Sequence, residues 1–162
     1  MAGWKLGNRM VRNDQVAVLF PMVAGSVATL CTIVIHSLVL GISVRLFRRE
    51  RELGLVGSRV WVHLGIFVLT MSFAFLAHLI EIALWAVLFL MCGEFKSLNL
   101  AFYHSAVNYT TLGYGDLIMS PSWKLLGPLE AADGALMFGV STAMIFAVAQ
   151  RLIRAKFRDL EG

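Results

Sequence analysis

The sequence predicts an all-α membrane protein with three transmembrane helices. Of its 162 residues, 59% are hydrophobic and only 15% are charged, which lies outside the usual composition of a soluble domain. The apolar residues form three blocks, each long enough to cross about 30 Å of hydrocarbon, which takes roughly 20 helical residues. Basic residues gather at the ends of these blocks, as they do at the cytoplasmic ends of membrane helices.

The positions of the charges and cysteines exclude several other classes. The net charge of +4 does not indicate a nucleic-acid partner, because positive-inside orientation accounts for the basic residues. Cys31 and Cys92 both lie in apolar runs, so neither a disulfide scaffold nor a zinc site of cysteines is indicated. We therefore expect a multi-pass protein of the cell membrane, plasma or inner, that is surrounded by the lipid bilayer.

The first span is predicted over residues 16–44. This block is too long for a signal peptide and shows no cleavage site, so we expect it to be retained as a helix. Small residues along one side would let a neighbouring helix approach closely. They are Ala24, Gly25, Ala28, Thr29 and Thr32. A basic loop follows, and residues 1–59 form the predicted N-terminal unit.

The second and third spans are predicted over residues 60–92 and 125–152, followed by a short cytoplasmic tail at 153–162. Trp61 and Trp85 near the ends of the second span are typical of interfacial aromatics. Three crossings place both basic clusters in the cytoplasm and the N-terminus outside. These clusters are also expected to hold anionic lipid head groups. Their arginines include Arg45, Arg48, Arg49, Arg151 and Arg154.

The segment between these spans, residues 93–123, predicts a re-entrant element. It begins with a helix capped near Ser97 or Asn99 that is too short to span, and continues as "TLGYGD" and the turn-like "SPSW". Non-helical backbone at membrane depth must be buried in protein or line a watery path, because lipid satisfies none of its polar groups. A pore element is therefore indicated.

The glycine spacing in this element indicates the chemistry of the pore. Gly113 and Gly115 reach positive φ at little cost, so successive carbonyls can face the same way. A column of carbonyls replaces the hydration shell of a bare monovalent cation, and the Thr111 hydroxyl adds a further oxygen. The pattern therefore favours a potassium-selective pore. It does not indicate an enzyme.

"TTLGYGD" resembles the signature filter of the potassium-channel family in its bacterial, pore-domain form, with Leu112 in place of the usual valine. The resemblance covers residues 60–152 as outer helix, pore helix, filter and inner helix. It implies a homotetramer that passes K⁺ passively, with no organic cofactor. The implied K⁺-coordinating residues are Thr111, Leu112, Gly113, Tyr114 and Gly115.

The resemblance also assigns residues that support the filter. Asp116 matches the carboxylate that anchors the outer mouth, and Tyr103 stands where the family usually has tryptophan. A tyrosine hydroxyl can donate to a carboxylate, so the clamp can persist in altered form. Asn108 and Thr110, at the end of the pore helix, complete the predicted support.

In the third span, Gly134 and Gly139 match family glycines, of which the first is often a gating hinge; close packing of small residues explains them equally well. The same alignment turns one helical face towards the pore axis, with Phe146 as a hydrophobic gate. That face comprises Ala135, Phe138, Thr142 and Phe146.

Ionisable residues within the spans leave alternatives open. Glu130 and Asp133 either bond Asn108 or Tyr109 on the pore helix, which we favour, or form an acidic ring. His78 and Glu81 lie one turn apart and could sense protons together with His36, although a structural pair is the simpler interpretation. His104 is either an acid sensor near the mouth or a packing residue.

The sequence also bears on three functions other than a potassium channel. "GYGD" fits the GxGD pattern of intramembrane aspartyl proteases, but that chemistry needs a second aspartate on a facing helix, and Asp133 lacks the partner motif. A weakly selective cation channel remains open because Tyr103 replaces tryptophan. The third alternative is a non-conducting subunit that docks on another membrane protein through its first span.

Overall fold

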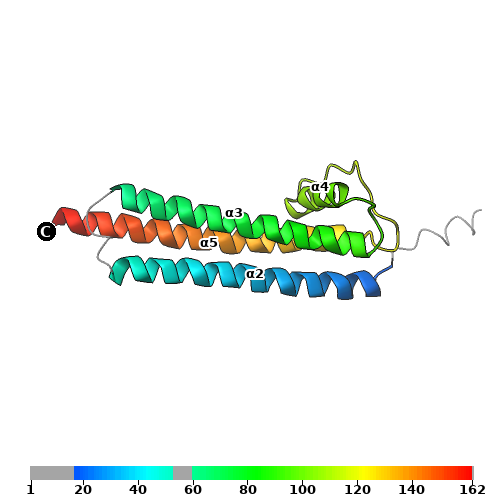
Figure 1. Ribbon diagram of the computed structural model, residues 1–162, viewed down its shortest axis with the longest axis horizontal. Coiled ribbons are helices and arrows are strands. Elements are labelled where there is room, and N and C mark those ends of the chain that lie inside the picture. Colours follow the sequence, from blue (N-terminus) through cyan, green and yellow to red (C-terminus); the bar gives the residue numbers. More distant parts are fainter. Residues whose placement is uncertain (1–16, 53–59, 162) are drawn as a thin grey trace, which may run out of the picture. The chain divides into compact units, whose positions relative to one another are not determined.

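The computed structural model describes residues 17–52 and 60–161, and this part contains four helices and no strand (Figure 1). They are α2 (Leu19–Glu52), α3 (Val60–Met91), α4 (Leu98–Tyr109) and α5 (Leu126–Glu161). Three are long and apolar enough to cross a membrane, over Leu19–Arg45, Leu64–Met91 and Leu126–Arg151. The predicted all-α membrane fold with three spanning helices is therefore confirmed.

Some sequence-based predictions fall outside the described residues. The orientation of the N-terminus rests on residues 1–16, and the basic loop includes residues 53–59. The backbone of α2 extends to Glu52, but the side chains of Arg48 and Arg49 are not described. These predictions stay predictions.

The helix boundaries agree with the sequence patterns except at the ends of α2 and α5. α2 continues to Glu52, eight residues past the predicted end of the first span and into the predicted basic loop. α4 begins after Ser97, whose Oγ accepts a hydrogen bond from the Leu100 amide at 3.4 Å, so the first of the two predicted caps is correct. Its 12 residues extend about 18 Å, too short to span a membrane. α5 continues through residues predicted as a tail, because "RLIRAKFRDLE" contains no glycine or proline and is rich in good helix formers.

The chain divides into two compact units. The first unit contains the described residues up to Leu30 together with Ile82–Gly134, and the second contains Cys31–Glu81 and the chain from Ala135 onward. Each of the three long helices contributes to both units. The domain boundaries predicted near residues 60 and 152 stay predictions.

In the first unit, α2 packs closely against the start of α5. A Cβ added to Gly25 would lie 2.8 Å from Leu129 Cδ1, which shows how near the two helices approach. Gly25 and Ala28 are buried whereas Val23 and Val27 are exposed, so the small residues predicted for this face make the contact. The largest apolar side chains with no exposed surface are those of Trp85, Phe89, Tyr109 and Leu126.

In the second unit, the buried face of α2 becomes polar. Thr32, His36 and Ser43 recur on the same helical stripe and are all buried. Buried polar groups also come from α3, through His78 and Glu81. Because unpaired polar atoms are costly in a membrane helix, we expect these groups to contact one another.

Candidate functional site

The segment after α4 has an alternating backbone conformation. Thr111, Gly113 and Gly115 have φ values of +61°, +59° and +71°, and no other described non-glycine residue has positive φ. The glycines therefore adopt the conformation expected from the sequence. Alternation of φ along residues 111–115 permits successive carbonyls to face one side. Positive φ at Thr111 was not foreseen, because it is strained for a residue with a Cβ.

Hydrogen bonds to the last turn of α4 hold the start of this segment. The Val107 carbonyl accepts from the Leu112 and Gly113 amides, at 3.0 and 3.2 Å, and the Asn108 carbonyl accepts from the Thr111 amide at 2.8 Å. Thr110 Oγ1 donates to the Ala106 carbonyl at 2.7 Å. These bonds satisfy carbonyls that a helix end leaves unpaired and set the direction in which the segment leaves the helix.

The far end of the segment is tied to the same helix by a side chain. Tyr103 Oη donates to Asp116 Oδ2 at 2.8 Å, so the hydrogen bond suggested by the family pattern is present with tyrosine as the donor. The bond to Asp116 raises the pKa of the Tyr103 hydroxyl, which remains a donor at neutral pH. The six residues from Thr111 to Asp116 are thus attached to α4 at both ends. All six are exposed in the single chain.

A second anchor, not found by sequence analysis, holds the chain after the segment. The Glu94 carboxylate accepts from the Ser120 amide at 2.7 Å and from the Ser120 hydroxyl. Glu94 directly follows Gly93, which ends α3 at φ +76°. The sequence signal was a carboxylate just past a helix-ending glycine, but it does not reveal a partner 26 residues away.

The two acidic residues of α5 bind different partners within the first unit. Ser105 Oγ donates to Glu130 Oε1, and the same hydroxyl lies 2.8 Å from the Ile82 carbonyl. The other carboxyl oxygen, Glu130 Oε2, has no hydrogen-bond partner among the described residues. A hydrogen bond between α4 and α5 is thus present at Glu130, with Ser105 as the donor in place of the predicted Asn108 or Tyr109.

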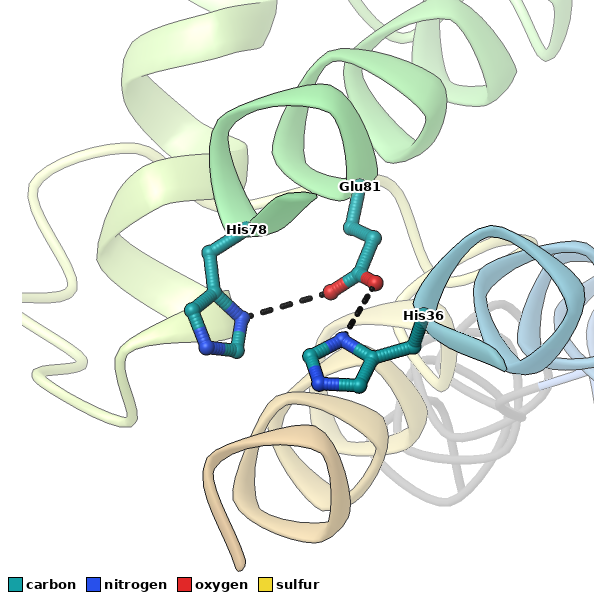
Figure 2. A group of neighbouring side chains, drawn as sticks. All are labelled: His36, His78 and Glu81. Atoms are coloured by element: carbon teal, nitrogen blue, oxygen red, sulfur yellow. Dashed lines mark hydrogen bonds and ion pairs between the residues drawn. The ribbon is translucent and has the colours of Figure 1, made fainter. Parts of the chain in front are cut away.

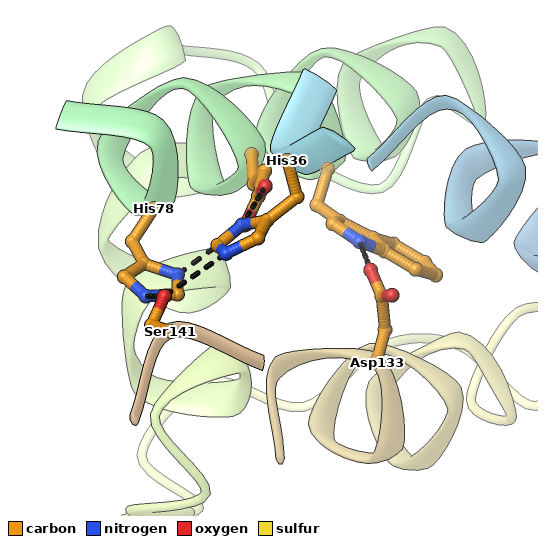
Figure 3. A network of polar contacts seen from close by, with 6 residues as sticks. His36, His78, Asp133 and Ser141 are labelled. Atoms are coloured by element: carbon orange, nitrogen blue, oxygen red, sulfur yellow. Dashed lines mark hydrogen bonds and ion pairs between the residues drawn. The ribbon is translucent and has the colours of Figure 1, made fainter. Parts of the chain in front are cut away.

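Asp133 Oδ2 accepts from Trp85 Nε1 at 2.8 Å, and Figure 3 shows Asp133 at a ring nitrogen. Trp85 is fully buried, so its interpretation as an interfacial aromatic is wrong. The indole N–H is a donor that needs a partner when buried, and the carboxylate supplies one. Glu130 and Asp133 are at most 1% exposed in the single chain, which argues against a bare acidic ring.

Gly134 lies against the backbone of α4. A Cβ at this position would be 2.0 Å from the Tyr109 carbonyl oxygen, whereas a Cβ at Gly139 would meet nothing within 4 Å. The close-packing interpretation therefore holds for Gly134 and not for Gly139. The lack of a side chain lets the end of α4, where the segment begins, rest directly on α5.

In the second unit, one face of α5 is exposed in the single chain. It includes the residues that the family alignment turns towards an axis, namely Ala135, Phe138, Thr142 and Phe146. Phe146 is 62% exposed, so the described part of its own chain leaves most of the predicted gate uncovered. Arg45, Arg151 and Arg154 are also exposed, at or just beyond the ends of spanning segments.

His104 packs among aromatic rings. Its ring centroid lies 4.9 Å from that of Phe95 and 5.4 Å from that of Phe89, and Asn108 Nδ2 lies 2.9 Å from His104 Nε2. Burial lowers the pKa of the His104 imidazole, and the carboxylates of Asp116 and Glu94 offset this only in part. The structure therefore favours a neutral packing histidine over an acid sensor.

A polar cluster joins three helices in the second unit. His36 of α2 and His78 of α3 both contact the carboxylate of Glu81, and Ser141 of α5 contacts both rings (Figures 2 and 3). The spacing of His78 and Glu81 predicts their proximity, whereas no sequence pattern indicates Ser141 as a partner. A serine in an apolar helix is not distinctive until its neighbours are known.

Comparison with known families adds one finding. Residues 77–151 match a family model described as an ion channel. The match includes the end of α3, all of α4, the segment after it, and α5 to Arg151. Neither the search of curated proteins nor the search of solved structures gave a match.

Replacing Gly134 by alanine should destabilise the protein. The added methyl group would collide with the Tyr109 carbonyl, which belongs to the backbone and cannot rotate away, so a loss of about 1–3 kcal/mol is expected. Thermal unfolding of the purified protein, followed by tryptophan fluorescence, measures it. Gly139→Ala is the matched control and should be neutral or slightly stabilising. Equal effects at both positions would contradict the close contact.

His104 should make the protein less stable in acid. The buried imidazole resists protonation, whereas the unfolded chain takes up a proton near pH 6.5, so stability falls as the pH drops below about 6.5. His104→Gln keeps an acceptor for Asn108 but does not titrate. Its melting temperature should therefore fall less than that of the wild type between about pH 7.5 and about pH 5.5. Superimposable profiles would show that His104 does not contribute.

Proposed function

We propose that this membrane protein, of which residues 77–151 match a family model described as an ion channel, is a potassium-selective channel that works as a homotetramer. K⁺ would pass down its electrochemical gradient through a filter made of one segment from each chain. The filter comprises Thr111, Leu112, Gly113, Tyr114 and Gly115. No organic cofactor is needed for this chemistry.

The observation that carries the proposal is the alternation of positive φ at Thr111, Gly113 and Gly115. A regular strand points its carbonyls to alternate sides, whereas this alternation lets consecutive carbonyls point to one side. Four such rows around an axis offer rings of oxygen that can replace the water around K⁺. Because these oxygens are neutral, the ion is held weakly enough to leave.

The exposure of the segment supports an assembly of several chains. Tyr114 is 67% exposed and Leu112 is 55% exposed, although both belong to an anchored segment. One segment can lie on only one side of an ion and cannot enclose it. Identical chains form a ring through closed cyclic symmetry, and the family resemblance implies four of them. Such a ring would cover the segment and the exposed face of α5.

The attachment of the segment to α4 supports a fixed filter geometry. The Val107 carbonyl holds its first amides, and the bond from Tyr103 to Asp116 holds its far end. The C-terminal end of a helix also carries roughly half a negative charge, which stabilises a cation nearby. α4 would thus both shape the filter and favour cation entry.

The contacts of the aspartates do not support the protease alternative. Asp116 bonds Tyr103 and is exposed, whereas Asp133 bonds Trp85 and is buried. A catalytic aspartate pair must share a proton across a short distance. Here each carboxylate has a different donor.

The exposed arginines support a further part of the proposal, namely contact with anionic lipids of the plasma or inner membrane. Arg45 and Arg151 end spanning segments, and Arg154 follows one turn later. A basic side chain near an anionic surface contributes about 1 kcal/mol of attraction. Several such residues on each chain would favour one orientation.

Ion flux into liposomes tests the potassium selectivity. The purified protein should carry K⁺ in a dye-reported flux assay and carry Na⁺ and Ca²⁺ far more slowly. Gly113→Ala should abolish the flux, because alanine at φ +59° is strained and the carbonyls would turn.

Gly93→Ala is the matched control for this assay. Gly93 also has positive φ, at +76°, and neither glycine has other atoms within 4 Å of its Cβ direction. The two substitutions therefore cause similar backbone strain, but only Gly113 lies in the filter. Comparable Na⁺ flux would contradict selectivity, and equal losses in both variants would contradict a special role for Gly113. Absence of flux in the wild type would favour the docking-subunit alternative.

The bond between Tyr103 and Asp116 should help to keep the filter conductive. Tyr103→Phe removes the hydroxyl donor and little else, so we expect steady K⁺ flux to fall several-fold while the protein stays folded. Tyr103→Trp supplies an N–H donor and should retain more flux than phenylalanine. Single-channel recording would show the loss as briefer openings. Full activity of Tyr103→Phe would show that the bond is dispensable.

A further inference from the structure

The polar cluster of the second unit is unusual for its depth and composition. His36, His78 and Glu81 are 3%, 7% and 0% exposed, and all three lie within spanning segments. His36 Nδ1 lies 2.9 Å from Glu81 Oε1, and His78 Nδ1 lies 3.3 Å from Glu81 Oε2 (Figure 2). Ionisable groups are expensive at this depth and generally mark functional sites.

Ser141 closes the cluster from the opposite side of both rings. Its Oγ lies 2.9 Å from His36 Nε2 and 3.0 Å from His78 Nε2 (Figure 3). Four contacts need four hydrogens if each is a hydrogen bond. The hydroxyl supplies one of them, and the two imidazoles and the carboxyl can supply the others. The cluster is therefore compatible with a membrane interior without a metal ion.

The same atoms also form a set of metal ligands. One ligand atom from each of His36, His78 and Glu81 can be chosen so that all three lie within 4.8 Å of one another. A tetrahedral ion with bonds of about 2.0–2.2 Å keeps its ligands about 3.3–3.5 Å apart. The two contacts with Glu81 measure 2.9 and 3.3 Å, close to this spacing, whereas the widest of the three separations is at most 4.8 Å. The side chains would therefore have to close in by up to about one ångström to surround an ion.

Ser141 would then orient both imidazoles. An imidazole that binds a metal through Nδ1 carries its hydrogen on Nε2. Both Nε2–H groups would point at the Ser141 oxygen, which has two lone pairs to accept them. Metal-binding histidines are usually held by an acceptor of this kind, and its removal weakens affinity about 10–100-fold.

We propose that His36, His78 and Glu81 form a binding site for a divalent transition metal, best matched by Zn²⁺. Two imidazoles and one carboxylate favour Zn²⁺ over Mg²⁺ or Ca²⁺, which prefer oxygen ligands. Water or hydroxide completes the four-coordinate shell, and hydroxide would cancel the remaining positive charge. The ion would join α2 to α3 directly and to α5 through Ser141. The first span would thus contribute one metal ligand, His36.

The site is tested with Co²⁺ and Zn²⁺ on the full chain, purified without a histidine tag. Co²⁺ should give the intense visible absorption of a tetrahedral site at one ion per chain, and Zn²⁺ should displace it. His36→Gln and Glu81→Gln should weaken binding by at least about 100-fold, since each removes a direct ligand. His63→Gln is the matched control and should bind normally, because it lies about 22 Å from His78 along α3.

Ser141→Ala keeps all three metal ligands and removes only the hydroxyl that would orient the two imidazoles. It should weaken Zn²⁺ binding about 10–100-fold. Zn²⁺ should raise the melting temperature of the wild type and of His63→Gln more than that of Ser141→Ala, His36→Gln or Glu81→Gln. Absence of tetrahedral Co²⁺ absorption in the folded wild type, or undiminished binding in the ligand variants, would overturn the proposal and leave a proton-only network. These measurements do not depend on conduction, so they stand apart from the test of potassium selectivity.

Discussion

Backbone amides and carbonyls at membrane depth need partners within the protein, and the structure of the first unit follows from this constraint. The segment after α4 is not helical, yet its first amides bond the Val107 and Asn108 carbonyls. α4 must therefore end at a fixed place, and Gly134 lets that end rest on α5. The conformation of residues 111–116 therefore depends on contacts with α4 as well as on the glycines of the segment itself.

Polar side chains supply the specific contacts between helices. Lipid is as apolar as leucine, so burial of leucine alone does not favour one helix pairing over another in a membrane. Each unit instead has polar bonds between helices, from Trp85 to Asp133 in the first and from His36 to Glu81 in the second. The same constraint that fixes these contacts also concentrates ionisable groups where an ion could bind.

For several residues, the contacts in the structure indicate a different role from the one that the sequence pattern predicts. Trp85 matched an interfacial aromatic by position, but its indole bonds a buried carboxylate. His104 matched a sensor near the mouth, but it packs between phenylalanines. Glu94 carried no motif, yet it holds Ser120. Sequence position limits how deep a side chain can lie, whereas its partners come from other helices.

The sequence by itself determined the helical class, the three spans, the short helix beginning after Ser97 and the glycines that adopt positive φ. These features depend on local chemistry: hydropathy over about 20 residues, a capping hydroxyl and the absence of a Cβ. Only the tertiary structure decided that Gly134 is a contact, that Asp133 pairs with Trp85, and that Ser141 completes the histidine cluster. These pairings join residues far apart along the chain, and a local pattern contains no information about which helix faces which.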